Sequence, residues 1–257
     1  AMSRLSLQEI KGLWAGIEQE LPVDIKEQGH QTFLDLLSIC ATNPCVKYII
    51  EAVKEDKLAG ESGAWILSNT IRSVKTPTEE LLKELTDLVK AIEHNTKMQS
   101  ALILSLSNLV YKACIDPSSS VYDYPVKTYG RFCDEKSTVI TRELIPYLSQ
   151  KLFAAQESDL NFILTAINAL GNIGHNGASI HLLKVIEGSP TSSPYLRSVA
   201  VYQLIKAASA NPTLYRPVIL SLISNYAESD EVRMAAITVL PYTRPDSAIF
   251  NKLAIRT

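Results

Sequence analysis

Glycine is scarce in this sequence, and so is a regular alternation of apolar and polar residues. Only 10 of the 257 residues are glycine, against an average usage near ~7%, and few segments show the period of two that a half-buried strand requires. Both deficits therefore favour helices over a fold built mainly from strands and tight turns. With 46% hydrophobic and 20% charged residues, the chain has the composition of a folded protein rather than of a disordered one.

Long apolar runs and an excess of charge of either sign are also missing. The uninterrupted apolar runs, such as 101–104 and 217–220, are much shorter than the roughly 20 residues that cross a bilayer, so we expect no membrane span. The formal net charge is −2, which gives no long-range attraction for a phosphate backbone. We therefore expect no nucleic acid partner. The opening Ala1-Met2 is typical of a cloning remnant, so we expect the chain to be a segment of a longer protein.

Apolar residues recur at spacings of three and four in almost every segment, which is typical of amphipathic helices. Ser6 with Glu9 has the spacing of a capping box, which predicts where the first helix begins. The linkers are mostly short, which favours antiparallel neighbours, and a long row of such pairs is a solenoid. The pattern predicts about thirteen helices, beginning near residues 6, 24, 43, 62, 76, 97, 137, 158, 178, 193, 211, 229 and 246.

Three segments in the second half of the chain resemble one another. Residues 164–170, 196–204 and 232–240 each combine apolar with small residues, and they follow at intervals of roughly 32 to 36 residues, which favours one helical hairpin per repeat. Arg197 and Arg233 each precede small residues by a few positions. We therefore expect helices to approach closely at the same point of each repeat.

Two further expectations concern glycines and tryptophans. Gly171 and Gly174 follow an apolar stretch, and we expect them to end the helix that begins near residue 158, because glycine readily adopts the left-handed geometry of a helix C-terminus. Trp14 and Trp65 lie on apolar faces of their helices. We therefore interpret them as core residues rather than as anchors in lipid.

The C-terminal third carries five motifs in a fixed order: Leu170-Gly-Asn-Ile-Gly-His175, Leu196-Arg-Ser-Val-Ala-Val-Tyr-Gln-Leu204, Pro217-Val-Ile-Leu220, Glu231-Val-Arg-Met-Ala-Ala-Ile-Thr-Val-Leu240 and Thr243-Arg-Pro-Asp-Ser-Ala-Ile-Phe-Asn-Lys-Leu253. Upstream, Leu106-Ser-Asn-Leu-Val-Tyr-Lys-Ala-Cys114 is similar to a helix that ends in a cysteine before a cysteine-closed loop. This order resembles the helical region of the large lipid transfer proteins, and among them the insect-type vitellogenins. The motifs cover about residues 98–257; the first hundred residues agree only in their helical pattern.

The resemblance implies an all-α fold, a two-layered α/α superhelix of antiparallel helix pairs. Residues 1–257 would then form a single helical domain of a larger lipoprotein. In that family the superhelix embraces lipid-bearing sheets, so the implied partners are a neighbouring β-barrel and the lipid-binding sheets of the same chain, with a lipid or membrane surface as another. The resemblance implies a non-catalytic domain of a secreted lipid carrier and yolk precursor, found in haemolymph-like fluid and yolk. It implies lipid in the parent protein and no cofactor in this domain.

Four cysteines form two locally spaced sets, Cys40 with Cys45 and Cys114 with Cys133. An even number in a secreted chain permits two disulfides in three possible connectivities. We favour the two local pairs, because the first would join a helix end to the next helix start and the second would close the long loop. Free buried thiols are the alternative, which the family resemblance makes less favourable.

The cysteine-bounded loop, residues 114–136, is rich in tyrosine, with Tyr122, Tyr124 and Tyr129. Tyrosine offers apolar area with a polar tip, so these side chains are candidates for contact with a partner domain, lipid headgroups or a receptor. The competing interpretation is that the rings pack over an edge of the solenoid.

Motifs for enzymatic chemistry are missing. The sequence has no Gly-x-Ser-x-Gly elbow, Walker loop or dinucleotide fingerprint, and we predict no enzyme. His175 and His181 with Glu187 are candidates for a metal site, but a histidine at a helix end explains His175 better, and we predict no metal. Two other functions stay open: a HEAT-like adaptor that binds a protein or peptide in its concave groove, and a helical hydrolase or transferase with an unrecognised site.

Overall fold

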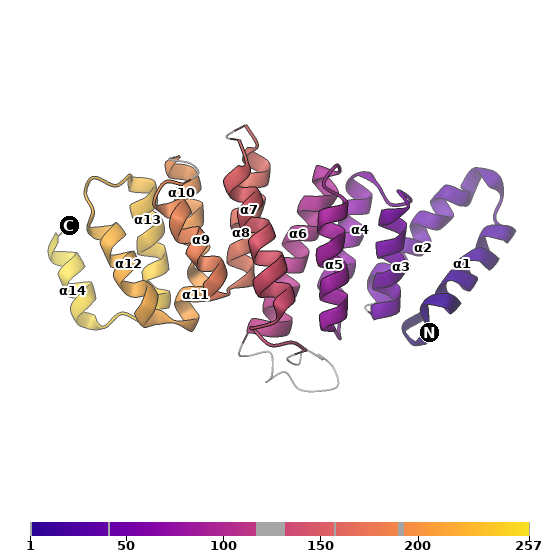
Figure 1. Ribbon diagram of the computed structural model, residues 1–257, viewed down its shortest axis with the longest axis horizontal. Coiled ribbons are helices and arrows are strands. Elements are labelled where there is room, and N and C mark those ends of the chain that lie inside the picture. The colour runs from indigo at the N-terminus through magenta and orange to yellow at the C-terminus, as the bar shows by residue number, and fades with distance from the viewer. Residues whose placement is uncertain (1, 41, 117–131, 157, 190–192, 257) are drawn as a thin grey trace. The chain divides into compact units, whose positions relative to one another are not determined.

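The computed structural model describes residues 2–40, 42–116, 132–156, 158–189 and 193–256. Within these ranges the chain forms fourteen α-helices and no β-strand (Figure 1), so the all-α prediction is confirmed. The chain separates into two compact units, Ala1–Leu144 and Ile145–Thr257.

The first unit arranges its helices in two layers. One layer holds α1 (Leu7–Glu20), α3 (Asn43–Lys54) and α5 (Glu79–Ala91), and the other holds α2 (Lys26–Cys40), α4 (Gly60–Ser73) and α6 (Thr96–Val110). Each helix packs on its neighbours in the same layer and on a helix of the other layer. In Figure 1, α3 and α5 lie in front of α4 and α6. This alternation between layers is what a solenoid of helix pairs requires.

The first helix begins where the capping box predicts. Ser6 is the N-cap of α1: its hydroxyl accepts a hydrogen bond from the Glu9 amide at 3.3 Å, and the Glu9 carboxylate accepts from the Ser6 amide at 2.7 Å. These hydrogen bonds lower the pKa of the Glu9 carboxyl. The reciprocal arrangement satisfies two amides that the helix itself leaves unpaired.

Helix α6 is more apolar than the sequence analysis anticipated. It continues into a π-helical turn, Tyr111–Ile115; the combined stretch has 20 residues, and an 18-residue window within it has a mean hydropathy of 1.2. Length and composition alone would let this helix cross a membrane. However, Leu102, Leu106 and Val110 are completely buried, and α6 packs on α4 and α5. The core helix of a folded unit meets the same criterion, so burial accounts for its apolar composition.

Small polar residues let α4 and α6 approach closely. The hydroxyl oxygens of Ser68 and Ser105 lie 2.6 Å apart, and the Ser105 hydroxyl also contacts the Ala101 carbonyl at 2.7 Å. If Ser105 donates to this carbonyl, Ser68 must be the donor between the two serines. With serine at both positions, the two helices are joined by a hydrogen bond where they meet, and no large side chain holds them apart.

The prediction that Trp65 belongs to the core is wrong. Its side chain is 60% exposed, whereas Ile66 and Leu67 beside it are completely buried. The buried stripe of α4 runs through Gly63, Ile66, Leu67, Thr70 and Ile71. Trp65 lies one residue off this stripe, which is about 100° around the helix. Trp14, in contrast, is half-buried.

The second unit places the three similar segments in one layer. They form α8 (Leu160–Ile173), α10 (Pro194–Tyr202) and α13 (Asp230–Val239), which contact one another in that order. Packed against this layer are α7 (Ile145–Ala154), α9 (Asn176–Ile186) and α12 (Pro212–Ser224). A short helix, α11 (Ile205–Ala210), follows α10, and α14 (Ser247–Arg256) follows α13 after a 3-10 turn. The repeat predicted from the sequence therefore corresponds to one helix of this layer per repeat.

One of the two glycines predicted to end α8 has a different role. Gly174 ends the helix with a left-handed φ of 66°. Gly171 lies inside the helix, and a side chain there would collide with Gln203. Gln203 is the C-cap of α10, where the helix predicted from residue 193 onward divides into α10 and α11, and its amide donates to the Asn168 side-chain oxygen at 2.7 Å. Glycine at position 171 therefore lets α8 lie against this break.

Arg197 and Arg233 perform the same task in successive repeats. The Nε–H of Arg197 donates to the Ile186 carbonyl at 2.7 Å, and the Nε–H of Arg233 donates to the Ile223 carbonyl at 3.4 Å. Both carbonyls lie at the C-terminus of the preceding helix, where the helix has no amide to offer them. Each arginine thus caps the C-terminus of the helix that precedes its own.

The two arginines differ in their carboxylate partners. Arg197 forms a two-pronged ion pair with Glu228, whose side chain is only 8% exposed, whereas Arg233 pairs with Asp230, which is 94% exposed. Burial raises the pKa of the Glu228 carboxyl, but hydrogen bonds from Arg197 and from the Ser229 amide outweigh burial and lower the pKa overall. Glu228 therefore remains ionised and bound to Arg197.

We expect Glu228→Ala to lower the free energy of unfolding by about 2 to 3 kcal/mol, because Arg197 would remain largely buried without its counter-ion. The matched change Asp230→Ala removes an exposed partner from Arg233, and we expect a loss of at most about 0.5 kcal/mol. Urea unfolding of both variants measures the difference. Equal losses of the free energy of unfolding in the two variants would show that the buried ion pair stabilises the fold no more than the exposed one.

Candidate functional site

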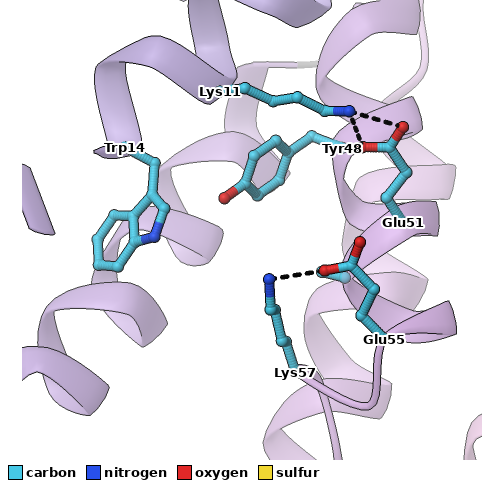
Figure 2. A pocket seen from close by; sticks show the side chains of 7 residues that line it. Lys11, Trp14, Tyr48, Glu51, Glu55 and Lys57 are labelled. Atoms are coloured by element: carbon cyan, nitrogen blue, oxygen red, sulfur yellow. Dashed lines mark hydrogen bonds and ion pairs between the residues drawn. The ribbon is translucent and has the colours of Figure 1, made fainter. Parts of the chain in front are cut away.

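The first unit contains a pocket of about 220 Å³ between α1, α3 and the turn that follows α3 (Figure 2). Helix α3 contributes residues spaced three and four apart, which lie on one face of the helix, and α1 contributes two residues three apart in the same way. The pocket is lined by Lys11, Trp14, Tyr48, Glu51, Ala52, Glu55 and Lys57.

A tight turn brings Lys57 to the pocket. Asp56 has a left-handed φ of 53°, and two hydrogen bonds follow: the Lys57 amide donates to the Ala52 carbonyl at 2.9 Å, and the Asp56 amide to the Val53 carbonyl at 3.2 Å. This is the Schellman arrangement, which satisfies the last carbonyls of a helix. It turns the chain back so that the Lys57 side chain meets α3.

Aromatic rings form one wall of the pocket and fix its shape. The Trp14 ring packs against His30 and Phe33, with ring centres 4.5 Å and 5.3 Å away. Phe33 in turn meets Tyr48 edge-on at 5.6 Å. Burial, and next the positive charge of Lys57, lower the pKa of the His30 imidazole. The ring behind Trp14 is therefore neutral at physiological pH.

Two ion pairs line the opposite side. Lys11 lies 2.8 Å from Glu51, and Lys57 lies 2.6 Å from Glu55. The hydrogen bond between Lys57 and Glu55 raises the pKa of the lysine and lowers the pKa of the carboxyl. All four side chains are between 38% and 59% exposed, so the pairs contribute little to stability. They do place two positive and two negative charges around one small cavity.

Tyr48 is the most unusual residue of the pocket. Only 9% of its surface is exposed, and its hydroxyl has no hydrogen-bond partner among the described residues. Burial and then the charges of Glu55, Glu18 and Glu51 raise its pKa to about 12. The phenol therefore keeps its proton at physiological pH and can donate it.

Sequence reasoning missed this pocket. The available signal was Tyr48 with Glu51 and Glu55 at spacings of three and four, which places them on one face of α3 beside the apolar stripe. That signal is weak by itself, because polar residues beside a buried stripe are usual on a surface helix. The partners on α1 and at Lys57 come together only through the packing of α1 on α3.

A second pocket of about 400 Å³ lies between α4 and α6 and is lined by Ser68, Arg72, Leu104, Ser105, Asn108, Leu109 and Lys112. Its serines bond to each other, and the Asn108 amide donates to the Leu104 carbonyl at 3.0 Å. These polar groups are therefore already occupied, which makes this pocket the weaker candidate.

The structure joins the cysteines in local pairs. Cys40, the last residue of α2, is bonded to Cys45 in the first turn of α3, with Cα atoms 6.2 Å apart. Cys114, in the turn after α6, is bonded to Cys133, with Cα atoms 4.7 Å apart. The first bond joins consecutive helices of opposite layers, and the second closes the loop that contains the tyrosines.

The other site residues predicted from the sequence fall into two groups. Tyr122, Tyr124 and Tyr129 lie outside the described residues. His175 is the N-cap of α9, and its ring nitrogen accepts from the Gly177 amide at 2.9 Å. His181 packs on Phe153, with ring centres 6.0 Å apart. Within the described ranges, no three histidine, cysteine, aspartate or glutamate side chains are grouped to hold a metal ion.

The comparison with known families decides the identity of the chain. Residues 1–257 match the family described as the vitellogenin TPR domain. The chain belongs to this family. The resemblance to vitellogenins found in the sequence is thereby confirmed.

Vitellogenins of insects and vertebrates are relatives of this vitellogenin TPR domain. It is 28% identical to vitellogenin-A1 of Aedes aegypti over 87% of this chain and 10% of the relative, and 29% identical to vitellogenin of Anthonomus grandis over 86% and 13%. Vitellogenin-A2 of Xenopus laevis is 25% identical over 97% of this chain and 13% of its own length. The chain therefore spans only about an eighth of these curated relatives.

A solved structure also matches. Lipovitellin, in a structure reported for its lipid–protein interactions, superimposes with a TM-score of 0.78 at 19% identity and covers 99% of this chain and 24% of that chain. The helical superhelix of lipovitellin is therefore the fold of this domain, as the sequence analysis predicted.

The two disulfides should differ in how much they stabilise the chain. Loop closure by Cys114–Cys133, across 19 residues, should contribute about 3 kcal/mol, and closure by Cys40–Cys45, across five, about 2 kcal/mol. We expect Cys114→Ser with Cys133→Ser to lower the melting temperature more than Cys40→Ser with Cys45→Ser, while helical circular dichroism persists. Non-reducing peptide mapping should recover each pair linked. Free thiols in protein from an oxidising compartment would contradict the pairing.

The burial of His181 predicts that the stability of the fold depends on pH. Its Nδ1 is buried without a hydrogen-bond partner, and burial, followed by the charge of Lys184, lowers its pKa. As the pH falls from about 7.5 to about 5.5, the unfolded chain takes up a proton more readily than the folded chain, so stability decreases. We expect His181→Gln to reduce this decrease in urea unfolding. The same change at exposed His94 should leave it unaltered, and an equal effect would refute the assignment.

Proposed function

We propose that this chain is a non-catalytic structural domain of a secreted, vitellogenin-like lipid carrier and yolk precursor. The match of the whole chain to the vitellogenin TPR domain is the observation that carries this proposal, and the lipovitellin fold supports it. In this proposal the two compact units act together as one helical domain. The lipid is held by the parent protein, with no cofactor in this domain, and the parent works in an extracellular fluid and in yolk.

The mechanism is architectural. Two layers of helices bury their apolar stripes against each other, so the domain is stable without a ligand and can present a firm outer face. The proposed partners are a neighbouring β-barrel and the lipid-binding sheets of the same parent chain. The short share of each relative that the chain covers supports the presence of such further domains.

Exposed apolar side chains support a partner on one layer of the second unit. Tyr195 and Tyr202 on α10 are 53% and 40% exposed, and Met234 and Ile237 on α13 are 59% and 46% exposed. They lie on two helices that contact each other. Large exposed apolar side chains on neighbouring helices are candidates for a surface that another domain covers. The alternative is a cytosolic HEAT-like adaptor that binds a protein or peptide in its groove. The match to the vitellogenin TPR domain does not favour it.

The experiment compares the isolated chain with the full-length parent. We expect Met234→Glu with Ile237→Glu to leave the melting temperature of the isolated chain nearly unchanged, because exposed positions tolerate charge. In the parent the same change should make the domain more sensitive to protease and reduce the lipid recovered with the secreted protein. The isolated chain should bind little triglyceride.

Leu214 provides the control, because it is 59% exposed but lies on α12 in the other layer. Leu214→Glu should leave the parent's protease sensitivity and lipid content unaltered. The proposed role would be refuted if Met234→Glu with Ile237→Glu changed neither the protease sensitivity nor the lipid content of the parent. Stoichiometric triglyceride binding by the isolated chain would refute it as well.

A further inference from the structure

The start of α9 contains a dipeptide that can react with itself, Asn176-Gly177. The backbone nitrogen after an asparagine can attack the side-chain amide carbon and close a five-membered succinimide ring. Glycine hinders this attack least, because it has no Cβ. No other asparagine of the sequence precedes a glycine, so this position is chemically distinct from every other asparagine of the chain.

The attacking nitrogen lies next to a base. The Gly177 amide donates to Nδ1 of His175 at 2.9 Å, whereas the amides of Ala178 and Ser179 donate to the His175 carbonyl. An imidazole nitrogen that accepts a hydrogen bond holds no proton, so it can take up the proton of the amide. A Cβ at position 177 would lie only 2.9 Å from this nitrogen. Glycine therefore lets the base come this close.

The carbonyl group under attack is polarised by two donors from outside α9. The side-chain oxygen of Asn176 accepts from the Asn211 amide and from the Tyr215 hydroxyl, each at 3.2 Å. Donors aimed at an oxygen on which negative charge develops stabilise the transition state. Tyr215 is only 3% exposed, and burial raises the pKa of its hydroxyl, which therefore keeps its proton. Asn176 itself is exposed, so water can reach it.

We propose that Asn176 is a self-modifying site, at which the folded chain converts the side-chain amide to a carboxylate. His175 takes the proton of the Gly177 amide while the nitrogen bonds to Cγ of Asn176, and Tyr215 and Asn211 hold the resulting oxyanion. The bond between Cγ and Nδ2 then breaks, and ammonia leaves with the proton from His175. Water hydrolyses the succinimide to aspartate or isoaspartate, so water is the sole co-reactant.

The two products have opposite effects on the start of α9. Aspartate places a negative charge at a helix N-terminus, where the dipole favours it, and the donors from Asn211 and Tyr215 bind a carboxylate more strongly than an amide. Isoaspartate adds a carbon to the backbone and shifts Gly177 away from His175. The site goes beyond the proposed function and is independent of it, because it uses only residues of the second unit.

The test compares the folded 257-residue chain with a synthetic peptide of residues 170–183, which is too short to hold a helix alone. Both are incubated at physiological pH and temperature, and peptide mass mapping follows the conversion of Asn176. We expect conversion to be at least about tenfold faster in the folded chain, because only the fold brings base and donors together. Exposed Asn225, which precedes a tyrosine, should stay unconverted.

Variants separate the base from the donors. His175→Asn keeps a side-chain acceptor at the N-cap but no base, and we expect conversion to slow at least about tenfold. Tyr215→Phe removes only the hydroxyl, and we expect conversion to slow about threefold to tenfold. A merely structural Tyr215 would give the opposite sign, because a looser helix start reacts faster. Exposed Tyr195 provides the control, since Tyr195→Phe should change nothing.

Circular dichroism checks that each variant is folded, and the comparison of chain with peptide needs no variant. The proposal is overturned if the folded chain converts Asn176 no faster than the peptide does, or if Asn225 converts equally fast. It is also overturned if His175→Asn leaves the rate unchanged, or if Tyr215→Phe leaves it unchanged or raises it. Cleavage of the chain after residue 176 would overturn it too, because the asparagine would then have attacked its own backbone carbonyl.

Discussion

Helices of one layer can lie close together only where small side chains face each other, and the rest of the structure depends on this constraint. Between α4 and α6 the small residues are Ser68 and Ser105; between α10 and α13 the completely buried Ala200 and Ala235 are available. Close contact in the layer brings the larger apolar residues into the space between layers, where each methylene group removed from water contributes about 0.8 kcal/mol. The exposed faces are then free to differ from helix to helix.

The sequence predicts features that depend on neighbouring residues and misses those that depend on packing. Ser6 with Glu9 locates a helix start because a capping box is closed within one turn, and the similar segments that contain Arg197 and Arg233 form corresponding helices of one layer. The predictions for Trp65 and Gly171 are wrong, because the first depends on where the buried stripe of α4 runs and the second on the approach of Gln203. The pocket was missed for the same reason.

Buried polar side chains in this domain mostly bond to their own helix. Thr70 donates to the Ile66 carbonyl and Thr86 to the Leu82 carbonyl, each four residues earlier. Such residues need nothing from other elements, so polar positions inside the stack place few demands on a neighbour. Tyr48 differs, since its hydroxyl lies far from the backbone and reaches only the pocket.

The arginine that closes the preceding helix has a consequence for how such chains change over evolution. Arg197 and Arg233 each bind a carbonyl of the helix just before their own. Both partners of each hydrogen bond therefore belong to the same helical hairpin. A duplicated hairpin would bring its own closure and leave other hairpins untouched, because in a stacked array each repeat contacts only its neighbours. Arrays of this construction can grow or shrink by whole hairpins while the old junctions keep their geometry.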